Sequence, residues 1–355
     1  MTDIADLIEG QTESYQTGTL ISARIASVLP PLMALCYPWS VWCFYNSISI
    51  MREVDSREKI VPLIAATISI ILTAVPSLIS YLMLLRPVER HDQFAGMRWI
   101  TYLAFAAPAL FTLERVVFAG FRSSIDDRYL WVLIWALLVA AAAIGRQPQT
   151  KRQPAWTRKL QFAHGTSAAI ILIVFLVVHL GNNFIGLLGA PVHIDLMESL
   201  RIWYRAGVVE VTLVGLFLFQ MVSGARLASI RQFAPGDSFR TLQVATGVGL
   251  MAFLLAHMIV IFIVARWEFG VDTNWTFATS FKVGILGSLS NSRQVPYYWF
   301  ALVVTLSHLA CGLRVVLLAH GWRVAIVNRL AISIMIGSAL FATATVAGML
   351  GLRLG

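Results

Sequence analysis

The residues with the most distinctive chemistry are three histidines, His179, His257 and His308, inside long apolar segments of the second half of the chain. Gln220 lies in a fourth such segment, where another histidine would complete the set. An imidazole in hydrocarbon is costly unless something binds it. Two imidazoles on different helices at one depth can serve as the axial ligands of a haem iron. The pattern therefore predicts haem binding inside a membrane.

The apolar segments reflect a composition far from that of soluble proteins. The chain has 355 residues, of which 58% are hydrophobic and 13% charged, whereas soluble domains carry about 25% charged residues. About nine stretches approach the ~20 residues that a spanning helix needs. We expect an all-α, polytopic membrane bundle with spans near residues 26–48, 61–85, 98–120, 129–145, 165–188, 206–231, 243–266, 296–319 and 329–352.

Depth within the membrane, counted at about 1.5 Å per residue, sorts the polar side chains into two layers. Counted from entry points into the membrane near residues 162 and 241, His179 and His257 fall about 25 and 24 Å from the cytoplasmic ends of their spans, in an outer layer. Gln220 and His308 fall about 21 and 18 Å from the outer ends, in an inner layer roughly 10 Å from the cytoplasmic face. The alternative is that each histidine only bonds a neighbouring helix.

Two glycines accompany the inner layer. Gly224 follows Gln220 by four residues, and Gly312 follows His308 by four, so each lies one turn along the same helix face. A missing side chain there lets a flat macrocycle approach the backbone. Small residues also serve plain helix packing in membranes, and that reading stays open.

Charge sets the expected orientation. The net charge of +9 belongs to the loops, because no run of Lys and Arg is interleaved with aromatics as a nucleic-acid surface would require. The positive-inside rule places the basic loop 146–159 in the cytoplasm, with the N-terminus inside and the C-terminus outside. No cleavable signal peptide is evident at the acidic N-terminus. The three cysteines form no CxxC pair, which indicates neither disulfides nor a zinc site.

The basic loop also divides the chain into two regions, residues 1–150 with four spans and residues 155–355 with five. All histidines within spans follow the loop, and the one earlier histidine, His91, is expected in a solvated loop. The first region carries one odd feature, the adjacent Glu114 and Arg115 inside its third span. Helix neighbours point about 100° apart, so each needs a partner elsewhere, in a structural polar clamp or an ion or proton path.

Two long outer loops, residues 189–204 and 267–294, are expected to lie along the membrane interface. The second is rich in the aromatic residues that favour that zone. His193, in the first, has no companion at ligand spacing. We expect it to be a solvated loop residue.

Four motifs stand out in residues 155–355. They are His164-Gly-Thr-Ser with His179 after 15 residues, Gln220-Met-Val-Ser-Gly224-Ala-Arg226, Gln243-Val-Ala-Thr246-Gly247 with nine residues before His257, and His308-Leu-Ala-Cys-Gly312. Together they resemble the cytochrome b membrane anchor of succinate dehydrogenase and fumarate reductase in its single-chain, five-helix form. That family carries two haems b.

The resemblance implies that His179 and His257 ligate the distal haem, the one far from the cytoplasmic subunits. It implies that His308 ligates the proximal haem together with the residue at position 220. Two-haem family members have histidine there, where this chain has Gln220, and an amide is a poorer iron ligand than imidazole. We therefore expect one haem b and leave a second open.

The resemblance also implies roles for polar residues near the span ends. Glu210, near the outer end of its span, is a candidate for handling quinone-linked protons. Arg314 would hold a proximal propionate if that haem is present. The candidate quinone or propionate contacts at the cytoplasmic side are His164, Thr166, Ser167 and Arg226.

The sequence as a whole predicts an electron-transfer subunit whose chemistry is carried by cofactors rather than by catalytic side chains. By the resemblance, it connects peripheral flavoprotein and iron-sulfur subunits with membrane quinone, in a bacterial inner (cytoplasmic) membrane and among its lipids. The role of residues 1–150 is unassigned. The alternative is a haem-free protein of the same fold that acts as a transporter, a scaffold or a quinone-binding anchor. Gln220 and the pair Glu114 and Arg115 favour that alternative.

Overall fold

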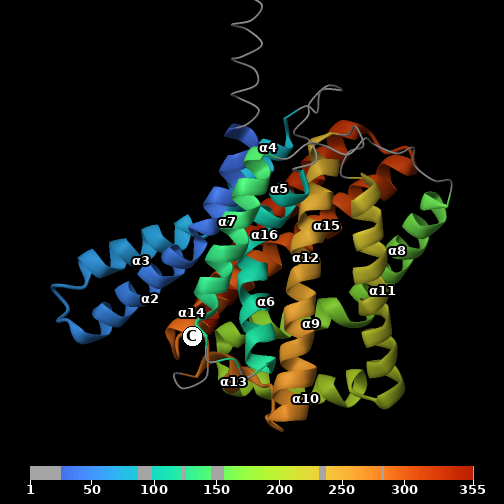
Figure 1. The fold of residues 1–355 in the computed structure, drawn as a ribbon. Helices are drawn as coiled ribbons and strands as arrows, with labels where there is room; N and C mark the ends of the chain where they lie inside the picture. Colours follow the sequence, from blue (N-terminus) through green and yellow to red (C-terminus); the bar gives the residue numbers. More distant parts are fainter. Residues whose placement is uncertain are drawn as a thin grey trace, which may run out of the picture.

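The computed structural model describes residues 25–86, 98–121, 123, 125–144, 156–231, 237–280 and 284–354. Within these ranges all regular structure is helical, which confirms the expected all-α membrane bundle (Figure 1). His91 and most of the basic loop 146–159 lie outside the described residues.

The described chain is a succession of helices, most of them long. Eight stretches of the described chain are long and apolar enough to cross a membrane, or nine if a bent pair counts as one span. The helices are α2 (Tyr37–Glu53), α3 (Ile60–Leu72), α4 (Val75–Leu84), α5 (Arg98–Phe105), α6 (Ala107–Gly120), α7 (Asp127–Ile144), α8 (Thr157–Ile171), η2 (Leu172–Leu176), α9 (Val177–Ile185), η3 (Gly186–Leu188), α10 (Ala190–Tyr204), α11 (Gly207–Arg231), α12 (Ser238–Met258), η4 (Ile259–Glu268), α13 (Trp275–Thr279), α14 (Leu289–Ser292), α15 (Gln294–Ala319) and α16 (Val324–Met349).

Prolines lie at breaks within the N-terminal spans. Pro108 lies in the first turn of α6, and α5 meets α6 at an angle of 78°. Pro76 lies in the first turn of α4, within the span Ile60–Leu84. A proline has no N–H to donate and its ring clashes with the preceding turn, so a helix breaks before it. The span expected at residues 98–120 is therefore two short helices that meet at a sharp bend.

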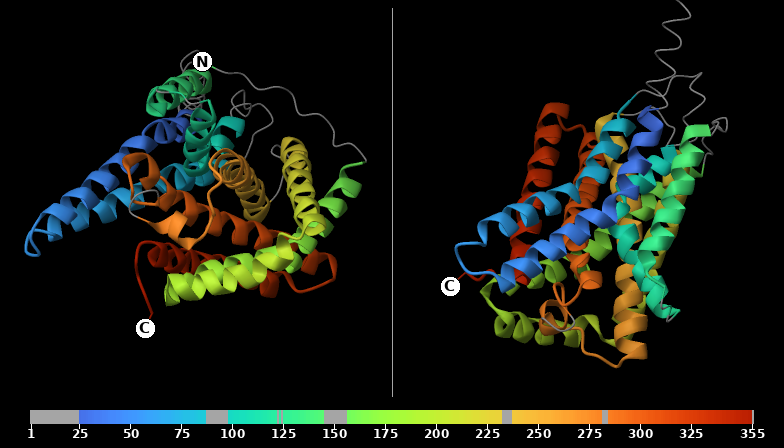
Figure 2. Two further views of the ribbon diagram at one scale, coloured as in Figure 1. Left: turned by 90° about the horizontal axis from the view of Figure 1, so that it is seen from below. Right: turned by 60° about the vertical axis from the view of Figure 1, so that its left-hand side comes forward.

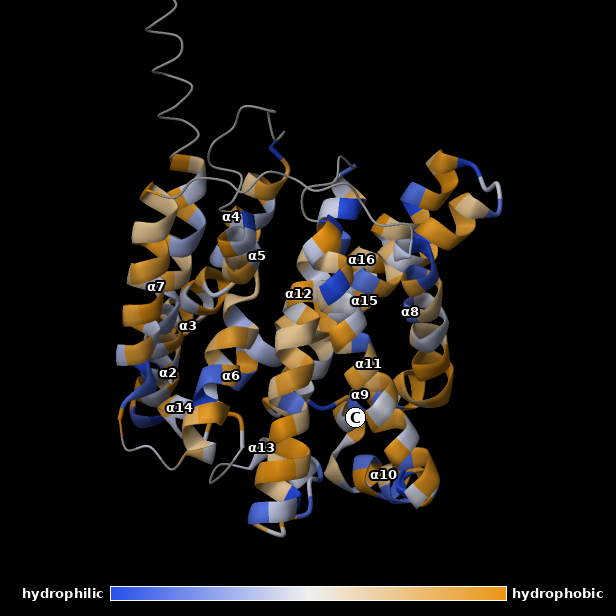
Figure 3. Ribbon diagram, turned by 45° about the vertical axis from the view of Figure 1, so that its right-hand side comes forward, coloured by the Kyte–Doolittle hydropathy of each residue, from blue (hydrophilic) through white to orange (hydrophobic). Residues whose placement is uncertain are grey.

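The two regions that the basic loop separates pack against each other. One buried cluster combines Tyr102 and Phe105 of α5 with Val248 of α12 and with Phe300 and Val304 of α15. The hairpin of α2 and α3 extends away on one side, while α8 and α11 form the opposite edge (Figures 1 and 2). Large apolar side chains such as Ile173, Val208 and Val222 remain exposed on the spans, as a lipid-facing surface requires. Figure 3 shows that hydrophobic residues predominate along the spans.

Helix α10 runs across the ends of the spans rather than parallel to them (Figure 2). It follows α9 after the single 3₁₀ turn η3, and Gly189, at φ 117°, precedes it as the N-cap. Only glycine adopts that backbone region readily. The segment expected to lie along the interface at residues 189–204 is thus a helix that runs across the ends of the spans.

Candidate functional site

The outer pair of histidines lies as the depth count predicts. His179 of α9 and His257 of α12 have ring centroids 6.3 Å apart, with the ring planes at 66°. Each ring stacks on a phenylalanine one turn earlier on its own helix, Phe175 at 4.8 Å and Phe253 at 5.3 Å. The stacking fixes the orientation of both imidazoles, because near-parallel rings leave few alternative rotamers.

The inner pair differs from the expected one. The ring of His308 on α15 lies 6.5 Å from the ring of His164 on α8, at an interplanar angle of 80°. Gln220, expected beside His308, instead donates its amide to the carbonyl oxygen of His164 at 2.8 Å and to Oγ of Ser167 at 2.6 Å. Gln220 therefore supports the helix turn that carries His164. The second imidazole of the inner layer is His164 itself.

Hydrogen bonds fix which nitrogen of each inner imidazole is free. Nδ1 of His164 lies 2.8 Å from Oγ of Ser223, whose own proton goes to the carbonyl oxygen of Phe219 at 2.5 Å. Nδ1 of His308 lies 3.1 Å from the carbonyl oxygen of Gln243. In both rings Nδ1 therefore carries the proton, and Nε2 keeps the lone pair that a metal needs.

Glycines make room for the inner rings. A Cβ on Gly247 of α12 would lie 3.1 Å from Cε1 of His308, and a Cβ on Gly224 of α11 would lie 3.4 Å from Cε1 of His164. Gly224 was expected to make room for a bound macrocycle. In the structure it makes room for the ring of His164. A Cβ on Gly312 would lie 4.0 Å from Nε2 of Gln243.

A π-helical segment separates the two histidines that share one span. His164 and His179 are 15 residues apart, on either side of η2. In a regular α-helix such residues point about 60° apart. The wider turns of η2 rotate less per residue and reduce that angle, so the two imidazoles leave the span in more similar directions. The span thus contributes one ring to each pair.

The spacing within both pairs fits an iron between two imidazoles. A metal–imidazole bond is about 2 Å long, and a ring nitrogen lies about 1 Å from the ring centroid. Two imidazoles on opposite sides of one iron therefore have centroids roughly 6 Å apart. The separations of 6.3 and 6.5 Å agree with this. No cluster of three or more metal-ligating side chains occurs in the described ranges, but haem takes only two ligands from the protein.

Comparison with known proteins adds no relative. No family model, curated protein or solved structure matches this chain. The function is therefore inferred from the chain's own residues.

The other polar residues singled out by sequence lie in separate environments. Glu210 forms an ion pair with Arg266 at 2.6 Å, so its carboxylate is already bound. The guanidinium of Arg226 lies over the ring of Trp156 at 5.2 Å, and Thr166 lies on the exposed face of α8. Ser167 is buried against the backbone of His164.

Arg314 is also held by neighbours, at the ends of three helices. Its Nε donates to Oδ1 of Asn328 at 2.8 Å, and its Nη2 pairs with Asp237, the N-cap residue of α12. The guanidinium also lies over the ring of Phe239. These contacts join the ends of α12, α15 and α16, which gives Arg314 a structural role in the inner layer.

His193 was expected to be solvated, and this prediction is wrong. Its side chain in α10 is 5% exposed and stacks on Trp275 at 4.7 Å. The amide of Asn182 lies 3.3 Å from its Nε2. Burial lowers the pKa of His193 to about 4. Helix α10 folds back against α13, a long-range contact that no local pattern reports.

Glu114 and Arg115 have different surroundings, as the helix geometry requires. Nε of Arg115 donates to Oγ of Ser290 at 3.0 Å, which links α6 to α14. Both carboxylate oxygens of Glu114 are buried without a hydrogen-bond partner among the described residues. The pair belongs to α6 of the N-terminal region and is separate from the histidine pairs.

Proposed function

We propose that this chain is a membrane cytochrome b that holds two haems, one between His179 and His257 and one between His164 and His308. The single observation that carries the proposal is the matched spacing of the two imidazole pairs, 6.3 and 6.5 Å between ring centroids. Four imidazoles inside an apolar bundle are costly without a ligand, and a haem iron supplies one for each pair.

The second haem enters the proposal because of His164. Because an amide is a weak iron ligand, the glutamine at position 220 led us to expect a single haem. His164 supplies the imidazole instead, and Gln220 holds the turn on which His164 lies. The hydrogen bonds from Nδ1 to Ser223 and to the backbone of Gln243 orient the two rings and make them better ligands.

Bound haem iron accepts and releases one electron at a time, and the protein sets its orientation and potential. His164 and His179 are 15 residues apart on one span, which corresponds to about 22 Å along the helix. Two redox centres at these depths would carry electrons from one face of the membrane toward the other. The motif resemblance supports membrane quinone as one redox partner and a peripheral flavoprotein with an iron-sulfur subunit as the other, in a bacterial inner membrane.

Haem stoichiometry tests the proposal. Protein purified after expression with added haem precursor should give a reduced-minus-oxidised cytochrome b spectrum and two haems per chain by pyridine haemochrome. His179→Ala and His257→Ala should each leave one haem, and the double variant should also leave one. His164→Ala and His308→Ala should behave in the same way for the other haem. A chain without Soret absorbance would overturn the proposal.

The pairing is tested separately from haem content. The double variants His179→Ala/His308→Ala and His164→Ala/His257→Ala combine residues from different pairs and should contain no haem. If either cross-pair variant kept one haem, the assignment of ligands to pairs would be wrong even though the chain binds haem. Redox titration then assigns a potential to each remaining centre in the single variants.

A further inference from the structure

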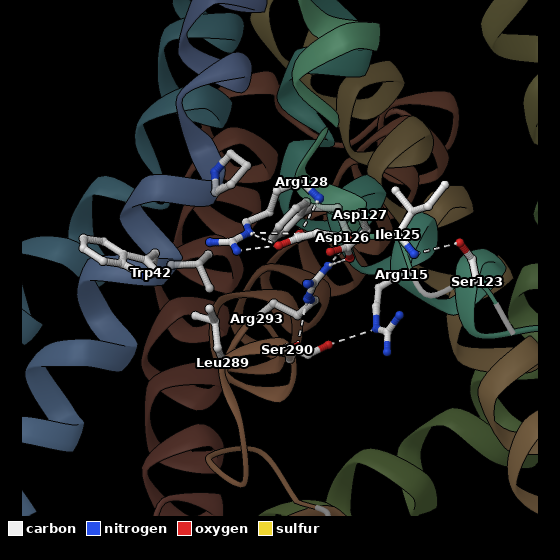
Figure 4. Close-up of a pocket in the computed structure, with 13 residues that line it drawn as sticks. Trp42, Arg115, Ser123, Ile125, Asp126, Asp127, Arg128, Leu289, Ser290 and Arg293 are labelled. Carbon is white, nitrogen blue, oxygen red and sulfur yellow. Dashed lines mark hydrogen bonds and ion pairs between the residues drawn. The ribbon is translucent and has the colours of Figure 1, made fainter. Parts of the chain in front are cut away.

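A pocket of about 450 Å³ opens at the outer end of the spans, where the N-terminal region meets α14 and α15 (Figure 4). It is far larger than a single water needs and falls in the range of sites for small ligands. One wall is apolar and comes from α2 and α14. The other is charged and comes from α6, from the start of α7 and from the residue before α15. The lining residues that the argument uses are Trp42, Arg115, Asp126, Asp127, Arg128 and Arg293.

The charges of this pocket do not balance. Arg293 pairs with Asp127 at 2.6 Å, and both side chains are buried, at 6% and 7% exposure. Arg128 pairs with Asp126. Three arginines therefore meet two aspartates on the pocket wall, and Arg115 is the cation left over.

Arg115 is positioned but not neutralised. Its Nε donates to the uncharged hydroxyl of Ser290 at 3.0 Å, and no carboxylate pairs with its guanidinium in the part of the chain that the structure describes. The carboxylate of Glu114, one residue earlier, does not line the pocket. Figure 4 shows Arg115 on one side of the ion pair of Arg293 and Asp127, and Trp42 on the other.

We propose that this pocket binds the phosphate of an anionic lipid through Arg115. An unpaired guanidinium within a membrane span is expensive unless an anion meets it, and its planar fork matches two oxygens of a phosphate. Within the described ranges no hydrogen bond involves either Nη of Arg115, so both can form that fork. In the two ion pairs beside Arg115, the opposite charges neutralise each other, and the paired side chains form part of the pocket wall.

The apolar wall favours a lipid over a soluble anion. Trp42 is 43% exposed and lies beside Pro38 and Val41 on α2, a helix of the hairpin that extends from the bundle. Tryptophan favours the headgroup level of a bilayer. When the phosphate of a lipid binds Arg115, its glycerol and acyl chains therefore lie along the apolar face of α2. This inference does not depend on haem binding.

Lipid affinity measured by native mass spectrometry tests the proposal. Full-length protein in a neutral maltoside detergent is titrated with phosphatidylglycerol, with phosphatidylcholine or with inorganic phosphate. Wild type should bind one phosphatidylglycerol more tightly than phosphatidylcholine. Arg115→Gln should weaken phosphatidylglycerol binding by about tenfold or more, as expected for a charge-assisted hydrogen bond, and should leave phosphatidylcholine unchanged.

The matched control is Arg57→Gln, because Arg57 is an exposed arginine in the turn between α2 and α3, outside the pocket. It should leave the affinity unchanged. Arg115→Lys retains the charge but not the planar fork and should give an intermediate loss of phosphatidylglycerol affinity. It replaces Arg115→Gln as the test variant if Arg115→Gln fails to fold. Equal loss in Arg57→Gln and Arg115→Gln would mean non-specific attraction and overturn the proposal. Full displacement of phosphatidylglycerol by millimolar inorganic phosphate would assign the site to a soluble anion and overturn the lipid assignment.

Discussion

The ring of His308 on α15 packs directly against Gly247 on α12, where a Cβ would lie 3.1 Å from Cε1 and 3.5 Å from Nδ1 of the imidazole. The same ring donates from Nδ1 to the carbonyl oxygen of Gln243, one turn earlier on α12. One face of α12 thus both limits the position of His308 and fixes its protonated nitrogen. Helix α12 also carries His257, so it contributes to both histidine pairs.

We therefore expect Gly247→Ala to disturb the inner pair alone. The added methyl group must push the imidazole of His308 away from its hydrogen bond, at an expected cost of about 1–3 kcal/mol for an overpacked site. The inner haem should be lost or its potential shifted, while the outer haem is unchanged. Redox titration followed at the cytochrome b absorbance band distinguishes the two centres.

Gly215→Ala is the control for that substitution, because a Cβ at Gly215 of α11 meets nothing within 4 Å. Its spectrum should equal that of wild type. An equal change in both variants would mean that the effect comes from helix backbone propensity and not from contact with His308.

Gln220 gives a second prediction about the inner pair. Gln220→Leu removes the amide that bonds the His164 carbonyl oxygen and Ser167 but removes no imidazole. The inner haem should remain bound, and its retention on heating should fall, because the turn that carries His164 loses two hydrogen bonds of about 1 kcal/mol each. His164→Ala should remove that haem entirely. Haem content by pyridine haemochrome before and after mild heating measures both. A complete loss of one haem in Gln220→Leu would point to Gln220 as a ligand.

The outer histidine pair could be predicted from sequence, and the inner one could not, for a definite physical reason. Counting 1.5 Å per residue placed His179 and His257 at one depth, and the error of a few residues in each boundary nearly cancelled. For His164, the predicted depth depends on the residue at which the span begins. A span that begins near residue 162 leaves His164 at the surface, whereas the helix begins at Thr157 and carries it about 10 Å inward.

Other features depended on contacts between distant segments. The bend before α6 follows from Pro108 in principle, yet its angle of 78° is set by packing against α12 and α15. Burial of His193 needs α10 to fold back onto Trp275. Arg293, outside every predicted span, is buried because Asp127 is its partner across 166 positions of sequence. Periodicity reports the exposed and buried faces of one helix, and it contains no information about such partners.

The ion pair of Arg293 and Asp127 should contribute strongly to stability. The guanidinium also donates to the carbonyl oxygen of Phe111 at 3.0 Å and lies over the Phe111 ring at 4.1 Å. Asp127→Asn leaves a buried, uncompensated cation, and we expect a loss of about 3–5 kcal/mol. The apparent melting temperature in detergent, followed by circular dichroism, measures it.

Asp126 provides the contrast one residue away. Its ion pair with Arg128 is largely exposed, so Asp126→Asn should cost about 0–1 kcal/mol. The hydrogen bonds from Arg128 lower the pKa of Asp126 to about 2. Because this pKa is lowered, the small contribution is present at neutral pH and is lost only as the pH falls through about 2. Equal destabilisation by the two Asp→Asn changes would contradict the difference in burial.

His193 should make stability depend on pH in a mildly acidic range. Its pKa falls to about 4 in the folded protein because of burial, against about 6.5 when unfolded. Between these values the unfolded chain binds a proton that the folded chain does not, so stability should decrease as the pH falls from about 6.5 to 4. His193→Phe keeps a ring against Trp275 and should reduce that slope. His320→Gln, at an exposed histidine, should leave the slope unchanged. Apparent melting temperatures at four or five pH values across this range test both.

Glu114 should be one of the few positions in the bundle where neutralising a charge does not destabilise the fold. Both of its carboxylate oxygens are buried and have no hydrogen-bond partner within the described ranges. Burial without a hydrogen bond disfavours the charged carboxylate, so Glu114→Gln, which keeps the shape, should raise the apparent melting temperature or leave it unchanged. Glu210→Gln is the matched control, because Glu210 pairs with Arg266 at 2.6 Å and its neutralisation should lower the melting temperature. A comparable decrease in melting temperature in both variants would mean that Glu114 also has a cationic partner. Its burial would then reflect a structural ion pair.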